Sequence, residues 1–102
     1  MDINFDKLEG FEWDQGNLEH IKKHDVDYKE CEEIFYNKPL QINEDKDHSS
    51  VTETRFEALG QTSKGRKLFL AFTIRKNKIR VISSRNQNKK ERREDEKIQS
   101  NT

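Results

Sequence analysis

The chain has 102 residues, 29% hydrophobic and 39% charged with a formal net charge of zero, which limits it to one domain with a small core over residues 1–102. Its single cysteine, Cys31, excludes an internal disulfide, and no apolar run approaches the roughly 20 residues that a membrane span needs. The N-terminus is acidic and lacks the apolar run of a secretory signal, so we expect a cytoplasmic protein in a reducing environment.

The first helix is expected just after a short strand at residues 11–13. Either Asp14 or Asn17 can cap this helix, which is expected to end near Asp25. The residues predicted for its inner side are Leu18, Ile21 and His24.

A second helix is predicted at residues 28–36. Asp27 and Glu30 form a capping-box pair at its start, and Pro39 disfavours helix in the residue before it. The residues predicted to be buried are Cys31, Ile34 and Phe35.

The second half of the chain predicts strands. A short strand at 40–43 and a polar loop at 44–50 precede three antiparallel strands, expected at 52–61, 66–75 and 79–85.

A charged helix ends the chain. Asn88 and Glu91 form a second capping pair, and the helix is expected to reach about Lys97, with residues 98–102 as a frayed tail. The predicted fold class is therefore α+β, a small antiparallel sheet with helices packed on one face.

Four arginines lie within or at the ends of the last two strands, which are otherwise the most apolar part of the chain: Arg66, Arg75, Arg80 and Arg85. The planar guanidinium group is well shaped to bind phosphate, so these strands predict both the core and an anion site. The alternative is that each arginine pairs with one of the 20 Asp and Glu residues and only solvates the open face of the sheet.

Charge is distributed unevenly along the chain. Residues 1–62 hold seven Lys and Arg against sixteen Asp and Glu, whereas residues 63–102 hold thirteen against four. This asymmetry indicates a basic surface for an anionic partner, with Lys89 and Lys90 extending the arginine patch. The alternative is that the two halves neutralise each other across the fold.

Two histidines of the first helix are candidates for chemistry. His20 and His24 are four residues apart, a spacing that can hold a metal, but no third ligand is evident, and neither a metal nor another cofactor is predicted. His24, beside Lys23, can instead act as a general acid or base. The alternative is a half-buried histidine that stabilises the C-terminus of the helix.

Four segments, in this order, resemble the BrnT family of toxins from type II toxin–antitoxin systems. They are FEWDQGNLEHIKKHDV at 11–26, the helix at 30–35, GRKLFLAF at 65–72 and IRVISSRNQNKKERR at 79–93. The resemblance implies a RelE-like α+β fold, a ribonuclease that blocks translation, and a cognate antitoxin that neutralises it. It also implies that the pair binds operator DNA through the antitoxin's DNA-binding domain.

The resemblance carries catalytic roles over by position, to Lys23, His24, Arg66, Arg80 and Arg85. By charge, we add the RNA-binding residues Arg75, Lys89 and Lys90. Two positions depart from the family pattern. Ser84 replaces the usual Ala, and Asp95 stands where an aromatic residue is common and could anchor the last helix.

The leading hypothesis is metal-independent RNA cleavage, in which the 2′-hydroxyl attacks the adjacent phosphorus. The arginines stabilise the phosphorane, and Lys23 or His24 transfers a proton. The alternative is a non-catalytic nucleic-acid-binding or regulatory subunit, and a third interpretation is a purely structural interaction protein. No element that reads base edges is evident, so sequence-specific DNA binding by this chain alone is not expected.

Overall fold

A computed structural model describes residues 7–100 of the chain, and the side chains of residues 7–97. Its helices and strands follow the predicted order. They are α1 (Gln15–Lys22), α2 (Tyr28–Tyr36), β1 (Gln41–Glu44), β2 (Arg55–Gln61), β3 (Lys67–Arg75), β4 (Lys78–Asn86) and α3 (Lys89–Ser100). The predicted α+β class is confirmed.

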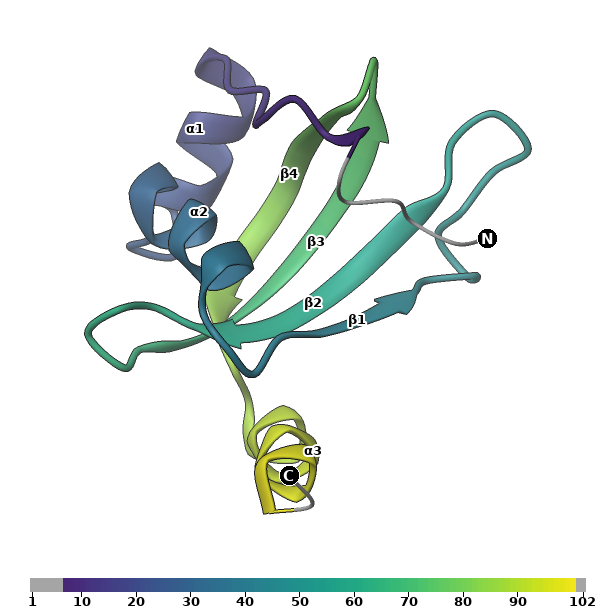
Figure 1. Ribbon diagram of the computed structural model, residues 1–102. Helices are drawn as coiled ribbons and strands as arrows, with labels where there is room; N and C mark the ends of the chain where they lie inside the picture. The colour runs from purple at the N-terminus through teal and green to yellow at the C-terminus, as the bar shows by residue number, and fades with distance from the viewer. Residues whose placement is uncertain (1–6, 101–102) are drawn as a thin grey trace.

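The four strands form one antiparallel sheet in the order β1-β2-β3-β4. Helices α1 and α2 cover one face of this sheet, whereas α3 lies beyond the end where β2 finishes and β3 begins (Figure 1). The prediction of helices on one face therefore holds for α1 and α2, and α3 packs separately. No helix among the described residues is long and apolar enough to cross a membrane.

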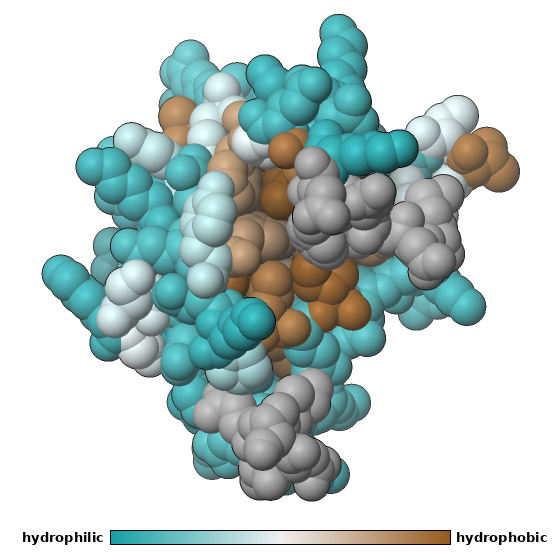
Figure 2. Space-filling model, viewed as in Figure 1, coloured by the Kyte–Doolittle hydropathy of each residue, from teal (hydrophilic) through white to brown (hydrophobic). Residues whose placement is uncertain are grey.

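The core lies between the sheet and the first two helices. Leu68, Leu70 and Phe72 alternate along β3 and are fully buried. The ring of Phe72 packs between Phe35 of α2 and Phe56 of β2, with centroid distances of 5.3 and 5.4 Å. Figure 2 shows hydrophobic side chains gathered in the middle of the face seen in Figure 1 and framed by hydrophilic ones.

A β-bulge interrupts the alternation of β4. Ala71 pairs with Ser83 and Phe72 with Val81, so Ile82 is the extra residue. Ser84, after the bulge, lies on the helix-covered face and is fully buried, whereas Arg80 before the bulge and Arg85 after it both lie on the opposite, open face. The bulge thus sets which side chains of β4 reach that open face.

The buried side chain of Asn17 joins helix α1 to the edge strand β4. Asp14 caps the helix and forms a capping box with Asn17. The Asn17 amide donates to the carbonyl oxygens of Glu12, at 3.0 Å, and Val81, at 3.1 Å. Because Asn17 is buried, these bonds satisfy an amide that water cannot reach and fix α1 beside β4.

Three local expectations need correction. The predicted strand at 11–13 is reduced to a single parallel bridge between Phe11 and Ile79. His24 is exposed rather than turned inwards, because α1 already ends at Lys22 and the chain reverses at Asp25, whose φ is 57°. Helix α3 reaches Ser100, beyond the expected end, and residues 101–102 of the expected tail lie outside the described residues.

Helix α2 and strand β2 approach closely at Gly60. A Cβ atom at this position would lie only 3.0 Å from the Cβ atom of Ile34, which is tighter than ordinary packing permits. The glycine therefore sets the distance between α2 and the sheet.

Candidate active site

The cations predicted to form one site are distributed over the two ends of β4. Arg85 lies at the end of β4 where Arg66 precedes β3, whereas Arg80 lies near its start. Their partners on β3, Thr73 and Phe69, are four residues apart, which corresponds to about 13 Å of strand at ~3.3 Å per residue.

The first place, the Arg66 cluster, comprises Arg66, Glu30, Asn86 and the turn at residues 23–25. Arg66 Nη1 donates to both carboxylate oxygens of Glu30 at 3.0 and 3.1 Å, and to the carbonyl oxygen of Asp25 at 2.8 Å. Its Nε donates to Asn86 Oδ1 at 2.8 Å, and Nη2 makes a long bond of 3.4 Å to the His24 carbonyl. Arg66 must therefore leave protein partners to bind a phosphate.

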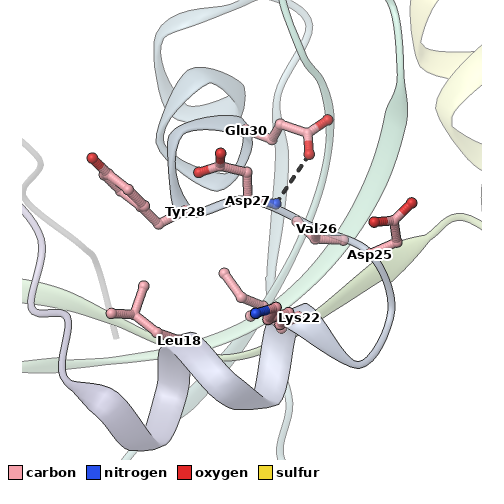
Figure 3. A pocket seen from close by; sticks show the side chains of 8 residues that line it. Leu18, Lys22, Asp25, Val26, Asp27, Tyr28 and Glu30 are labelled. Atoms are coloured by element: carbon pink, nitrogen blue, oxygen red, sulfur yellow. Dashed lines mark hydrogen bonds between the residues drawn. The ribbon is translucent and has the colours of Figure 1, made fainter.

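Lys23 and His24 follow α1 and are both exposed. The backbone carbonyl of His24 accepts the long bond from Arg66, so the turn that carries both residues lies beside Arg66. A pocket of about 380 Å³ lies nearby between α1 and α2, and Figure 3 shows Leu18 and Lys22 on one side of it and Tyr28 and Glu30 on the other.

The lining of this pocket is mainly acidic. Asp25, Asp27 and Glu30 contribute three carboxylates, against the single ammonium group of Lys22. A phosphate placed here would face like charges, so this pocket is poorly suited to RNA.

Arg85 is held by α3 on the open face of the sheet. Its guanidinium donates to both oxygens of Glu91, at 2.7 and 2.9 Å, and lies 4.2 Å from the ring centroid of Phe69. The bonds to Glu91 raise the pKa of Arg85 above its ordinary value. Lys89 and Lys90, two of the predicted RNA-binding residues, are exposed at the start of α3.

Arg80 is positioned by two acidic residues that precede α1. Its Nη1 donates to Glu12 Oε1 and to Asp14 Oδ2, both at 2.8 Å, and Nη2 makes a 3.4 Å bond to Asp14 Oδ1. The hydrogen bond with Asp14 raises the pKa of Arg80 and lowers that of Asp14. Within residues 7–97, these three bonds occupy three of the five guanidinium N–H donors and leave two for a ligand.

The second place, the Arg80 pocket, is a hollow of about 240 Å³ with three guanidinium groups. Arg55 on β2, Thr73 on β3 and Arg80 on β4 are direct partners in the sheet register. Because neighbouring strands are ~4.8 Å apart, the Cα atoms of the two arginines are separated by about 10 Å. Arg75 also lines the pocket, so three cations surround the buried Thr73.

The remaining polar lining of the Arg80 pocket comes from two other segments. His20 reaches it from α1, and Glu53 reaches it from the loop before β2. Glu53 Oε2 accepts from Arg75 at 2.8 and 3.1 Å, while Oε1 lies 3.8 Å from Arg55 Nε. Arg55 is therefore loosely paired. Arg55 and Glu53 are the charged residues of this pocket that the sequence analysis did not predict as site residues.

The contacts support the alternative interpretation of the charge asymmetry. Arg66, Arg75 and Arg80 each bind a carboxylate from the acidic first part of the chain. The two oppositely charged halves thus neutralise each other in part across the fold. The arginines are held in fixed positions by these pairs, but a phosphate must compete with the carboxylates.

The described residues contain no group of three or more His, Cys, Asp or Glu side chains that could hold a metal ion. The fold and the Arg80 pocket define a small α+β protein in which three guanidinium groups, the side-chain groups best shaped to bind phosphate, line one hollow.

Comparison with known protein families identifies the family to which the chain belongs. A family model described as the ribonuclease toxin BrnT of type II toxin–antitoxin systems matches residues 13–91. The chain belongs to this family: it is a ribonuclease toxin, and it has an antitoxin as its partner. Among curated proteins, no match was found.

Proposed function

We propose that this toxin cleaves RNA without a metal ion, using arginines to stabilise the charge that develops on the phosphorus. The observation that carries this proposal is the Arg80 pocket, where three guanidinium groups converge on one hollow of the open sheet face. Fixed cations aimed at developing charge usually supply the largest part of the rate enhancement. The pocket has room for roughly eight water volumes of ~30 Å³, enough for a phosphodiester group.

Of the residues predicted from the sequence, Arg80 has the strongest support, because it lines this pocket and is only 18% exposed at its side chain. Arg75 lines the same pocket and suits the RNA-binding role. The other proposed members of the site are Lys23, His24, Arg66 and Arg85, with Lys89 and Lys90 as RNA-binding residues. These residues lie towards the opposite end of β4. Arg85 is on the open face, where a longer RNA strand would reach it, whereas Arg66 is bonded to α2 and to the turn that carries Lys23 and His24.

The cellular role follows from the family. We propose that RNA cleavage inhibits translation in the cytoplasm and that the cognate antitoxin blocks the RNA site. Operator DNA would be bound only through the antitoxin, because a toxin that binds phosphates through arginines alone has no means of reading bases.

The experiment is to incubate purified toxin, separated from its antitoxin, with RNA in the presence of EDTA. We expect cleavage products, and we expect Arg80→Ala to abolish both cleavage and growth arrest while the variant remains folded by circular dichroism. Binding of RNA without cleavage would favour the non-catalytic alternative. Cleavage that disappears with EDTA and returns with added metal would overturn the metal-independent mechanism.

A further inference from the structure

We propose that His20 and Glu53 are the proton-transfer pair of the Arg80 pocket and that Arg55 is its additional phosphate ligand. This inference rests on the proposed RNA cleavage and assigns the chemistry to residues other than Lys23 and His24. Its basis is that one pocket holds an imidazole, a carboxylate and three guanidinium groups.

The reaction defines what such a site must contain. Attack by the 2′-oxygen forms a bond to phosphorus while the bond from phosphorus to the 5′-oxygen breaks. A base must take the proton of the 2′-hydroxyl, and an acid must supply one to the 5′-oxygen. The products are a 2′,3′-cyclic phosphate and a 5′-hydroxyl, so no oxidant, reductant or further reactant is needed.

The two pockets near the predicted catalytic residues differ in charge. The pocket between α1 and α2 has three carboxylates and one lysine, whereas the Arg80 pocket has three arginines and one glutamate. Only the second can attract a phosphodiester and also offer both a base and an acid. Lys23 and His24 line neither pocket.

His20 is placed in the Arg80 pocket by the same contacts that fix α1. It lies three residues after Asn17, on the same side of the helix, and the Asn17 amide is bonded to the Val81 carbonyl on β4. His20 is exposed, so its imidazole can exchange protons with water between turnovers. The charged groups that face it across the pocket are Glu53, Arg55, Arg75 and Arg80.

In the free protein, the carboxylate of Glu53 occupies the place where we propose that a phosphate binds. Its carboxylate bonds to Arg75 and lies near Arg55, as a bound phosphate would. When a phosphodiester takes over these guanidinium groups, the carboxylate is released from them and can face the 2′-hydroxyl. Glu53 then accepts the 2′-hydroxyl proton, and the His20 imidazolium protonates the leaving 5′-oxygen.

The first experiment measures kcat, KM and the pH–rate profile of RNA cleavage in EDTA for His20→Ala, Glu53→Gln and Arg55→Ala. We expect His20→Ala and Glu53→Gln to lower kcat by about 10²–10⁴-fold with little change in KM. His20→Ala removes the alkaline limb of the profile and Glu53→Gln the acidic limb. Arg55→Ala mainly raises KM.

Two matched controls are expected to cleave RNA at the wild-type rate. They are His48→Ala, in an exposed loop, and Glu94→Gln, on the exposed surface of α3.

A second substrate distinguishes a role of His20 as the general acid from a purely structural role. When sulfur replaces the bridging 5′-oxygen, the leaving group departs without protonation. This substrate should restore His20→Ala to near the wild-type rate and leave Glu53→Gln slow. Failure to restore it overturns the assignment of His20 as the acid.

The remaining outcomes are also decisive. Wild-type rates in folded His20→Ala and Glu53→Gln variants would overturn the inference, as would the same losses in Lys23→Ala or His24→Ala instead. A wild-type toxin that cuts no RNA in EDTA would defeat the proposed function itself, which is a different result. Unchanged melting temperatures show that any loss is not caused by unfolding.

Discussion

Arg66 donates from Nη1 to both oxygens of Glu30 and thereby joins the segment before β3 to α2. The same guanidinium binds the carbonyl oxygen of Asp25 in the turn after α1. One side chain thus ties three parts of the chain together. These contacts predict a structural role for Arg66, whereas the resemblance to the toxin family implies a catalytic one.

Arg66→Ala should lower the free energy of unfolding by about 1–2 kcal/mol, because hydrogen bonds to charged groups contribute ~1.5–3 kcal/mol and these side chains are partly solvated. Urea denaturation measures the loss. In a double-mutant cycle with Glu30→Gln, which keeps an acceptor for the helix cap, the two changes should not be additive. A variant that is as stable as wild type but inactive would instead support the catalytic role of Arg66.

Asp95→Asn should stabilise the protein. Asp95 is only 1% exposed in α3, and its Oδ1 has no hydrogen-bond donor among the described residues, nor has the nearby Gln87 Oε1. A buried carboxylate with an oxygen that accepts no hydrogen bond is costly, whereas the amide of the variant can donate to Gln87 Oε1. We expect a gain of about 1 kcal/mol, or roughly 4–8 °C in Tm for a domain of this size. Glu94→Gln, on the exposed side of the same helix, should change Tm little.

The burial of Asp95 also clarifies a departure from the family pattern. The sequence analysis predicts that the last helix loses an anchor, because Asp95 stands where an aromatic residue is common in the family. In the structure, this position does face the sheet, but the contact is made by a bond of 3.4 Å from Gln87 Nε2 to Asp95 Oδ2. The anchor is polar rather than absent.

The helices and strands were predicted well from the sequence, because helix caps and the alternation of apolar residues in strands depend on residues close together in the chain. Asp14 and Asp27 cap α1 and α2, and the apolar residues of β3 are buried as their alternation predicts. Alternation also places Arg55 and Arg80 on one face of their strands. Their juxtaposition across Thr73 required the strand register, which depends on turn lengths and on the bulge at Ile82.

The sequence could not decide between His20 and His24, the two histidines of the predicted first helix, for a related reason. His20 and His24 share one helical face only if the helix continues through both. The helix ends at Lys22, so His20 stays beside β4 while His24 turns towards solvent. The position of a helix end is decided by tertiary contacts that the local pattern does not contain.

Glu91→Gln should destabilise the protein in a pH-dependent way. Burial opposes ionisation of Glu91, but hydrogen bonds from Arg85 and from the Asn88 backbone lower its pKa below the ordinary 4.5. A lowered pKa in the folded state stabilises the protein above the unfolded value, and this stabilisation is lost as the pH falls through the folded value. Near neutral pH we expect the variant to lose about 1 kcal/mol.

The amide side chain of the Glu91→Gln variant would keep an oxygen acceptor for the Asn88 backbone N–H, so this substitution tests the charge rather than the helix cap. Urea denaturation of both proteins, near neutral pH and well below the ordinary pKa of glutamate, gives the comparison. A difference that persists unchanged in acid would contradict the ion pair with Arg85 as its cause.

Cys31 should be unreactive in the folded protein and should make stability fall in alkali. It is fully buried, and this burial raises the pKa of its thiol from an ordinary 9.0 to about 11. Between these values the unfolded chain loses the proton and the folded chain keeps it, so stability is complete below the unfolded pKa and decreases as the pH rises. With ~1.36 kcal/mol per pKa unit, the full effect is about 2–3 kcal/mol.

Cys31→Ala removes this titration and should therefore lose less stability than wild type between neutral pH and pH of about 11, although it starts from a lower value because of the cavity it creates. Urea denaturation across this range measures the two slopes. In parallel, the rate of thiol modification of the wild-type protein should follow its unfolding rate. Fast modification under native conditions would show that the thiol is accessible, and the raised pKa would then lose its physical cause.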